Sequence, residues 1–270
     1  MKTLPVALQL YTVRDHLAED FEGTLKAVKA AGYDYVEPAG MLGHTCEEFK
    51  AALDAAGLKA VSSHVPLAEM AENPEKVIAD YAKLGIKYVV VPYLPEELRY
   101  GTDKFDSTLA DIAKIAKCAK ACGMQLLYHN HDFEFTKTAD GRYALDYMYD
   151  TVSELATELD VCWVRVGGAC PVEYLKKYAD RAPVVHLKDY VGEKSANMYE
   201  LIGIKSDAAP KPSTFEFRPV GAGVQDFPAI LAAVVETNAE YVVVEQDQSY
   251  AQDSVAAAKQ SRDYLKTLGW

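Results

Sequence analysis

The segment Ala182-Pro183-Val184-Val185-His186-Leu187-Lys188-Asp189 is a short apolar run that ends in three functional side chains. A buried strand of a parallel sheet has this pattern, because its middle is covered on both faces while its carboxyl end leaves the core. The segment therefore predicts a strand that delivers His186 and Lys188 to a site at the end of the sheet.

Three other apolar runs lead into side chains that can bind a metal. They are 125–128 followed by His129, His131 and Glu134, 155–159 followed by Asp160, and 241–244 followed by Glu245. A single histidine or carboxylate at a strand end is more often structural, but four successive strand ends with such residues favour a common site. Two or three carboxylates with an imidazole suit manganese, magnesium or cobalt, and zinc is also compatible.

Strand-like and helix-like segments alternate along the whole chain. The expected strands are 6–11, 33–37, 58–64, 86–93, 124–131, 155–162, 182–189 and 240–247. The expected helices are 21–31, 47–56, 74–84, 105–121, 143–153, 171–178, 227–238 and 249–268. Local signals support these bounds: Thr45 is a good N-cap for the second helix and Gly57 a good terminator.

Alternating strands and helices predict a parallel sheet of the α/β class. Eight strand–helix units in about 250 residues match the size of a closed (β/α)8 TIM barrel. An open doubly wound sheet is the alternative, but the first strand is not followed by a Gly-x-Gly-x-x-Gly turn. We therefore expect a single (β/α)8 barrel domain over residues 1–270, with its active site at the carboxyl ends of the strands.

One long irregular stretch, residues 190–225, separates the seventh strand from the seventh helix. Loops of this length in a compact domain are usually functional or disordered. The segment 215–221 is too aromatic for a disordered linker, so we expect the stretch to form a wall or lid of the site. Within it, 220–223 could offer backbone amides to a phosphate or could simply form a turn.

Bulk properties exclude several classes of protein. The formal net charge of −12 argues against a nucleic-acid partner, because such binding depends on cationic contacts with phosphates. The sequence has no apolar run of about 18 residues, so no membrane span is expected, and 1–5 carry no secretion signal. The five cysteines are irregularly spaced and are interpreted as reduced thiols of a cytoplasmic protein.

Several short motifs together identify a family. They are Leu8-Gln9-Leu10-Tyr11-Thr12-Val13-Arg14-Asp15, Tyr128-His129-Asn130-His131-Asp132-Phe133-Glu134-Phe135, Leu159-Asp160-Val161-Cys162-Trp163, His186-Leu187-Lys188-Asp189, Val220-Gly221-Ala222-Gly223 and Val244-Glu245-Gln246-Asp247. With these motifs, the chain resembles the sugar phosphate isomerase/epimerase family of the xylose isomerase-like TIM barrels, which is related to the inosose dehydratases. The resemblance spans essentially the whole chain.

The resemblance implies one divalent metal ion held by Glu134, Asp160, His186 and Glu245. Many family members have glutamate at the position of His129, so the ligand from the fifth strand is open. Two-residue alternation places His129 and Glu134 on opposite faces of the strand, and Glu134 can turn inward only if the strand bulges or ends early. We expect Glu134 to be the ligand, with His129 as the first alternative and Asp132 as the second.

The implied reaction is isomerisation or epimerisation of a sugar or keto-sugar. Glu134 or Glu245 would remove the proton next to the carbonyl, and the other would return a proton. The metal and Lys188 would hold the negative charge of the enediolate intermediate. His129 could bind a hydroxyl group or share in the proton transfer.

Further residues are candidates for binding the substrate. They are His64, His131, Arg218, Tyr11, Glu37 and Trp163. Trp163 would stack on the apolar face of a sugar ring, and Arg218 would close over a carboxylate, phosphate or hydroxyl group of the ligand. The same resemblance makes a homodimer possible, because barrels of this group often pair.

Other functions remain open. The main alternative is a dehydratase or lyase that acts on a keto-sugar, an inosose or a 3-ketoglycoside, because deprotonation next to a carbonyl also permits β-elimination. A sugar-binding barrel without catalysis would not need four metal ligands. A related abasic-site endonuclease would need more histidine ligands and a basic groove. The string His129-Asn130-His131 also suggests a His-Asn-His nuclease, but there the three residues are not consecutive.

Overall fold

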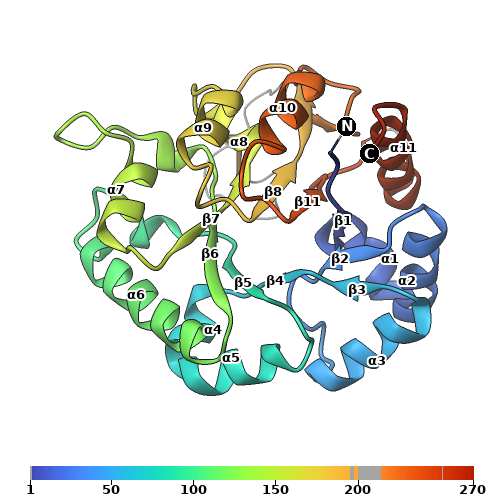
Figure 1. The fold of residues 1–270 in the computed structure, drawn as a ribbon, viewed down its shortest axis with the longest axis horizontal. Helices are drawn as coiled ribbons and strands as arrows, with labels where there is room; N and C mark the ends of the chain where they lie inside the picture. The colour runs from blue at the N-terminus through green and yellow to red at the C-terminus, as the bar shows by residue number, and fades with distance from the viewer. Residues whose placement is uncertain (1, 195–197, 200–213, 251) are drawn as a thin grey trace.

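A ring of parallel strands surrounded by helices forms the framework of the computed structural model, which describes residues 2–194, 198–199, 214–250 and 252–270 (Figure 1). The strands of the ring are β1 (Val6–Gln9), β2 (Tyr35–Glu37), β3 (Lys59–Ala60), β4 (Ser62–His64), β5 (Tyr88–Val91), β6 (Gln125–His129), β7 (Ala156–Asp160), β8 (Val184–Leu187) and β11 (Tyr241–Val244). Their order in the sheet is β3-β2-β1-β11-β8-β7-β6-β5-β4.

The sheet closes because β3 and β4 are two halves of one run, separated only by Val61. β3 pairs with β2, and β4 pairs with β5. Backbone bonds from Val61 N to Val36 O (3.0 Å) and from His64 N to Pro38 O (2.9 Å) continue the pairing of this run with the second strand. The prediction of a (β/α)8 barrel is therefore confirmed, with the expected third strand interrupted at Val61.

The helices lie outside the ring (Figure 1). They are α1 (Arg14–Glu19), α2 (Phe21–Ala30), α3 (Cys46–Ala56), α4 (Leu67–Glu72), α5 (Pro74–Ala82), α6 (Phe105–Ala121), α7 (Ala144–Thr151), α8 (Val161–Val166), α9 (Pro171–Lys177), α10 (Phe227–Val234) and α11 (Ser254–Thr267). The cap signals of α3 act as expected: Thr45 and Glu48 form a capping box, and Gly57 adopts a left-handed φ of 71°.

Three short helices, α1, α4 and α8, were not expected from the sequence. In α8 the reason is local, because the Asp160 carboxylate accepts a hydrogen bond from Trp163 N at 2.8 Å and so caps a new helix. The strand expected over 155–162 therefore ends at Asp160. This early end turns Trp163 away from the path that a continuing strand would have given it.

Two apolar layers enclose the strands. The outer layer packs the helices against the outward-facing residues of the sheet. The inner layer forms the floor of the barrel interior and consists of Ala7, Val61, Tyr88, Val90, Leu127, Ala156, Val184 and Val243. Polar side chains inside the barrel therefore begin only above this floor, toward the carboxyl ends of the strands.

The expected long loop 190–225 contains a two-stranded antiparallel ribbon, formed by β9 (Asp189–Val191) and β10 (Glu216–Arg218). Residues 195–197 and 200–213 of that loop lie outside the described residues. The rest of the segment includes Phe215 and Phe217, which pack with Trp163 and Tyr190 in a buried aromatic group. Its described ends are thus built into the wall of the barrel.

Asp189 fixes the base of this ribbon. Its Oδ2 accepts hydrogen bonds from Gly221 N (3.1 Å) and Gly223 N (2.8 Å), and its Oδ1 accepts bonds from Tyr190 N (2.9 Å) and Gln225 N (3.1 Å). The amides of Gly221 and Gly223, considered above for phosphate binding, are therefore already bonded to a carboxylate within the protein. The segment 220–223 is a turn held by Asp189.

The five cysteines are all free thiols, as their irregular spacing predicted. Among the described residues, no helix has the length and apolar character needed to cross a bilayer.

We expect Asp189→Asn to lower the free energy of unfolding by about 2–4 kcal/mol, because the new amide group faces backbone N–H donors that it cannot satisfy. Val224→Ala, in the same turn but with an exposed side chain, should change it by less than about 0.5 kcal/mol. Urea denaturation of both variants provides the measurement. Equal stability of the two variants would contradict the role assigned to Asp189.

Candidate metal centre at the carboxyl end of the barrel

Side chains of alternate residues along each strand point into the barrel, and the inner polar site follows from this alternation. On β7, Ala156 belongs to the apolar floor, and Glu158 and Asp160 rise above it in turn. On the run that includes β8, Val184 belongs to the floor, and His186 and Lys188 follow. The barrel interior is therefore apolar at its floor and strongly polar toward its carboxyl end.

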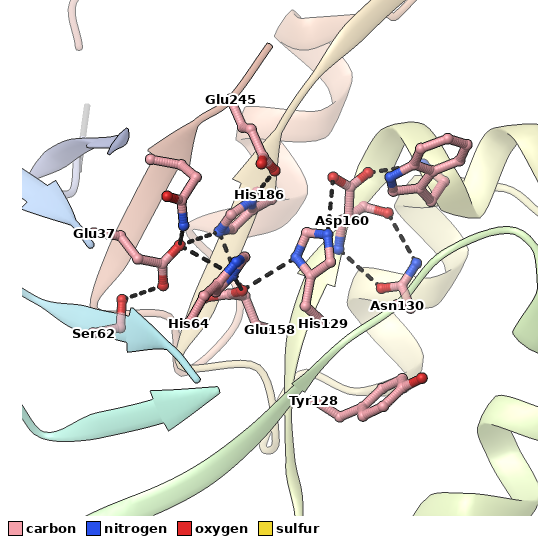
Figure 2. Close-up of polar contacts among 12 residues, drawn as sticks. Glu37, Ser62, His64, Tyr128, His129, Asn130, Glu158, Asp160, His186 and Glu245 are labelled. Carbon is pink, nitrogen blue, oxygen red and sulfur yellow. Dashed lines mark hydrogen bonds and ion pairs between the residues drawn. The ribbon is translucent and has the colours of Figure 1, made fainter. Parts of the chain in front are cut away.

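The rim group is formed by His129, Asp160, His186 and Glu245, which are buried and come from the ends of neighbouring strands (Figure 2). One ligand atom from each of these residues lies within 4.8 Å of the others. Strand register explains the arrangement in part, because Asp160 on β7 is paired with His186 on β8. These are the residue types and the spacing that a single cation requires.

Asn130 holds the ends of β6 and β7 together. Its side-chain oxygen accepts a hydrogen bond from Asp160 N at 2.9 Å, and its side-chain nitrogen donates to Asp160 O at 3.3 Å. The backbone of Asp160 is thus fixed on both sides, and its carboxylate is placed at the rim (Figure 2).

A second set of contacts lies deeper in the barrel and centres on Glu158. Its Oε2 lies 2.7 Å from His64 Nε2, 3.1 Å from His129 Nδ1 and 3.2 Å from His186 Nε2. Glu158 is opposite His129 in the register of β6 and β7. Together with His64, His129 and His186 it forms a deeper group whose ligand atoms also lie within 4.8 Å of one another.

Glu37 closes the deeper side of the site. Its Oε2 lies 2.8 Å from His186 Nε2 and accepts a hydrogen bond from Gln9 Nε2 at 2.7 Å, and Ser62 Oγ donates to its Oε1. Burial raises the pKa of Glu37, and the neighbouring charge of Glu158 raises it further. Glu37 therefore lies beneath the site as a partner of His186 and does not form a wall of the pocket, which corrects the position expected for it.

Lys188 lies among three carboxylates. Its Nζ is 2.8 Å from Asp247 Oδ2, 2.9 Å from Glu245 Oε2 and 3.5 Å from Asp160 Oδ2. Burial alone would lower its pKa, but the charges of Asp247 and Glu245 outweigh burial and raise the pKa well above its ordinary value. Lys188 is therefore a buried ammonium ion at neutral pH.

Glu245 is held in its charged form by the same contacts. Burial would raise the pKa of this carboxyl, but Lys188 and the hydrogen bond from His186 outweigh burial and hold the pKa well below its usual range. By contrast, burial raises the pKa of Asp247 to about 6 against the opposing charge of Lys188. At neutral pH the site thus offers an ionised carboxylate, Glu245, beside an ammonium group.

The structure does not bring Glu134 to the rim group, although the family resemblance implied it. The chain leaves β6 after His129 and forms a 3-10 turn over Phe133–Phe135, which turns Glu134 to the outer face of the strand. There its carboxylate accepts hydrogen bonds from Tyr128 Oη and from His131 N at 2.8 Å. His129, the first alternative at this strand end, lies in the rim group instead.

A cavity of about 340 Å³ opens beside the rim group. The predicted site residues that line it are Tyr11, His64, His129, His131, Lys188 and Glu245. Trp163 was expected to stack on a sugar, but it is fully buried with Phe215 and Phe217. Arg218 was expected to close over the ligand, but it pairs with Glu216 and donates to Phe217 O.

The sequence analysis missed several residues of the site, among them Glu158, Asp247 and Tyr93. Two of them carried a signal, because counting two residues back from Asp160 gives Glu158 and two forward from Glu245 gives Asp247. Both lie on the inward face of their strands. Tyr93, which lines the cavity, follows the end of β5 and had no comparable signal.

The charges and unpaired atoms of the site fit a divalent cation. Buried carboxylates crowd the end of the barrel, namely Glu37, Glu158, Asp160, Glu245 and Asp247. Asp160 Oδ2 and Glu158 Oε1 are buried and accept no hydrogen bond in the described part of the chain. Burial of unpaired charge is costly, so a cation bound by the rim group would stabilise the site.

Comparison with known proteins agrees with this geometry. The model of the xylose isomerase-like TIM barrel family matches residues 25–268. An inosose dehydratase of Geobacillus kaustophilus is 25% identical, over 94% of this chain and 88% of the relative. A sugar phosphate isomerase/epimerase from Parabacteroides distasonis is 25% identical and superposes with a TM-score of 0.77, covering 98% of both chains. A xylose isomerase-like barrel from Mycobacterium smegmatis, solved in complex with magnesium, is 17% identical with a TM-score of 0.66, covering 98% and 96%.

A matched pair of glutamine variants tests which residue of the fifth strand end binds the cation. His129→Gln should weaken the binding of Mn²⁺ by more than about tenfold, since it removes a residue of the rim group. Glu134→Gln should leave the affinity unchanged, because Glu134 faces Tyr128 on the other side of the strand. Isothermal titration calorimetry gives both affinities, and the reverse result would restore Glu134 as the ligand.

The pH dependence of stability should depend on Glu134. Burial raises the pKa of this carboxyl to about 8, so the folded protein retains a proton that the unfolded chain releases above its ordinary value of 4.5. Stability is therefore lost as the pH rises between these values, by up to about 1.4 kcal/mol per pH unit. Urea unfolding at several pH values should give a flatter profile for Glu134→Gln than for the wild type. Parallel profiles would contradict this assignment.

Proposed function

This chain belongs to the xylose isomerase-like TIM barrel family, and we propose that it is a metal-dependent isomerase or epimerase of a sugar or keto-sugar. The observation that carries the proposal is the rim group beside the cavity, with an ionised carboxylate and a buried ammonium ion at its edge. A site of this kind can remove a proton next to a carbonyl group and hold the charge that results.

The proposed ligands of the metal are His129, Asp160, His186 and Glu245. When bound, a divalent ion would supply Lewis-acid polarisation of the substrate carbonyl. Magnesium prefers oxygen ligands, whereas imidazoles suit zinc and other transition metals. The presence of His129 in place of a carboxylate therefore favours manganese, cobalt or zinc over magnesium.

Proton transfer is assigned to Glu245, which is ionised at neutral pH and lines the cavity. Lys188 donates a hydrogen bond to the enediolate oxygen, and its contacts with Asp247 and Glu245 hold the ammonium group in place. Glu134, which the resemblance offered as the partner acid or base, faces away from the cavity. The return of the proton is therefore assigned to Glu245 or to His131.

Substrate hydroxyl groups would contact the polar side chains of the cavity wall, Tyr11, His64 and His131. Burial lowers the pKa of His131 well below its ordinary value, as do the charges of His129 and Lys188. His131 is therefore neutral at neutral pH and can accept or donate a proton. The proposal includes a small-molecule sugar and a cytoplasmic location, and it places no phosphate on the Gly221–Gly223 amides, which Asp189 occupies.

A dehydratase or lyase acting on a keto-sugar, an inosose or a 3-ketoglycoside is the second candidate, favoured by the 25% identity to an inosose dehydratase. Both reactions begin with the same deprotonation by Glu245. They diverge when a hydroxyl or glycosyl group β to the carbonyl departs, which requires a proton donor near the leaving oxygen. Lys188 and His131 are the candidates for that donor.

Incubation with Mn²⁺ and a panel of keto-sugars and inososes in deuterium oxide tests the common step and separates the two outcomes. Solvent deuterium in recovered substrate or in its isomer would support the isomerase or epimerase. Loss of water with a new enone absorption would support the dehydratase. Loss of a glycosyl group would support the lyase. The absence of both exchange and elimination across the panel would contradict the proposal.

Glu245→Gln should reduce the rate of the deuterium exchange by about 10²–10⁴-fold, the usual contribution of a general base. Glu134→Gln is the matched control and should retain the exchange, because its carboxylate lies outside the cavity. The bound metal must be measured in both variants, since Glu245 is also a proposed ligand. Exchange at the wild-type rate in Glu245→Gln would contradict its assignment as the base.

A further inference from the structure

One oxygen atom of Glu158 contacts three histidine side chains at the bottom of the site (Figure 2). The carboxylate is fully buried on β7 and does not line the cavity. Neither proton transfer nor substrate binding, as assigned above, uses this residue. Its position below the rim group suggests a different role.

Each of two imidazoles in the rim group has one nitrogen directed down and one directed up. His129 places Nδ1 3.1 Å from Glu158 Oε2, and its Nε2 lies 3.8 Å from Asp160 Oδ2. His186 places Nε2 3.2 Å from Glu158 Oε2, and its Nδ1 lies 3.0 Å from Glu245 Oε2. The lower nitrogens therefore face Glu158, and the upper nitrogens face the carboxylates of the rim.

The nitrogen that carries the proton of a neutral imidazole is set by the acceptor that the nitrogen contacts. A carboxylate accepts protons and donates none when ionised, so Glu158 selects protonation of His129 on Nδ1 and of His186 on Nε2. The opposite nitrogens, Nε2 of His129 and Nδ1 of His186, then have free lone pairs directed toward the rim.

We infer that Glu158 is a positioning residue, which fixes the tautomer and the ring orientation of His129 and His186 so that both present a lone pair to the cation. The inference rests on the proposed function, because that proposal makes these histidines ligands. Glu37 supports the same arrangement at His186, where its Oε2 accepts from Nε2 at 2.8 Å. Glu158 is the residue that acts on both imidazoles at once.

A second ion bound directly by Glu158 is the alternative, since the deeper group of His64, His129, Glu158 and His186 has suitable spacing. The contacts of Glu158 favour the positioning role. The distances of 2.7, 3.1 and 3.2 Å to the imidazole nitrogens are those of N–H···O hydrogen bonds. A deeper ion would also need the lower nitrogens of His129 and His186 without their protons.

The tautomers can be measured without any metal, by long-range ¹H–¹⁵N correlation spectra of the metal-free protein labelled on its six histidines. We expect His129 to carry its proton on Nδ1 in the wild type and to lose this preference in Glu158→Gln. Thr157→Val, a neighbour on the same strand whose side chain points to the opposite face, should leave the spectrum unchanged. A wild-type His129 protonated on Nε2 would overturn the inference, even if Glu158→Gln does not fold.

Calorimetric titration with Co²⁺ alone gives the second readout, together with the visible spectrum of the bound ion. We expect one ion per wild-type chain, about 10–100-fold weaker binding and an altered spectrum in Glu158→Gln, and no change in Thr157→Val. Two ions per wild-type chain, with one lost in Glu158→Gln, would make Glu158 a ligand and overturn the inference, as would unchanged binding and spectrum. Failure of the wild type to bind Co²⁺ would refute the metal site of the proposed function, and the tautomers would still decide the role of Glu158.

Discussion

Burial of carboxylates inside the barrel is the constraint on which the site depends. Glu37, Glu158 and Asp160 are fully buried, and an isolated ionised carboxylate in such a place would be strongly unfavourable. The protein compensates by placing imidazoles and one ammonium group between the carboxylates, so that Lys188 contacts three of them and Glu158 contacts three histidines. Removal of one partner would leave the others uncompensated, which explains why these residues must be considered as a unit.

Much of the fold could be predicted from local signals, because buried strands and capped helices are specified by short segments. The apolar run before His186 forms β8, and Thr45 and Gly57 delimit α3 as expected. The rim could be predicted as far as Asp160, His186 and Glu245, which follow directly from the ends of strands. These parts needed no knowledge of how distant segments pack.

The remainder depended on small departures from regular strand geometry. The 3-10 turn after β6 decides that Glu134 faces Tyr128, and the helix capped by Asp160 decides that Trp163 is buried. Neither turn has a strong sequence signal, and each reverses the direction of a side chain. Glu158 was different, because strict alternation from Asp160 would have placed it inside the barrel. Attention to strand ends alone hid a residue that lies one step deeper.

The clamp at Asp189 has a consequence for how such a protein can diversify. Both ends of the excursion between β8 and α10 are tied to one carboxylate and to the ribbon of β9 and β10. Insertions or deletions between the two ribbon strands would therefore leave Lys188 and the rest of the catalytic end undisturbed. Evolution could exchange this module to admit new substrates while the reaction chemistry is inherited intact.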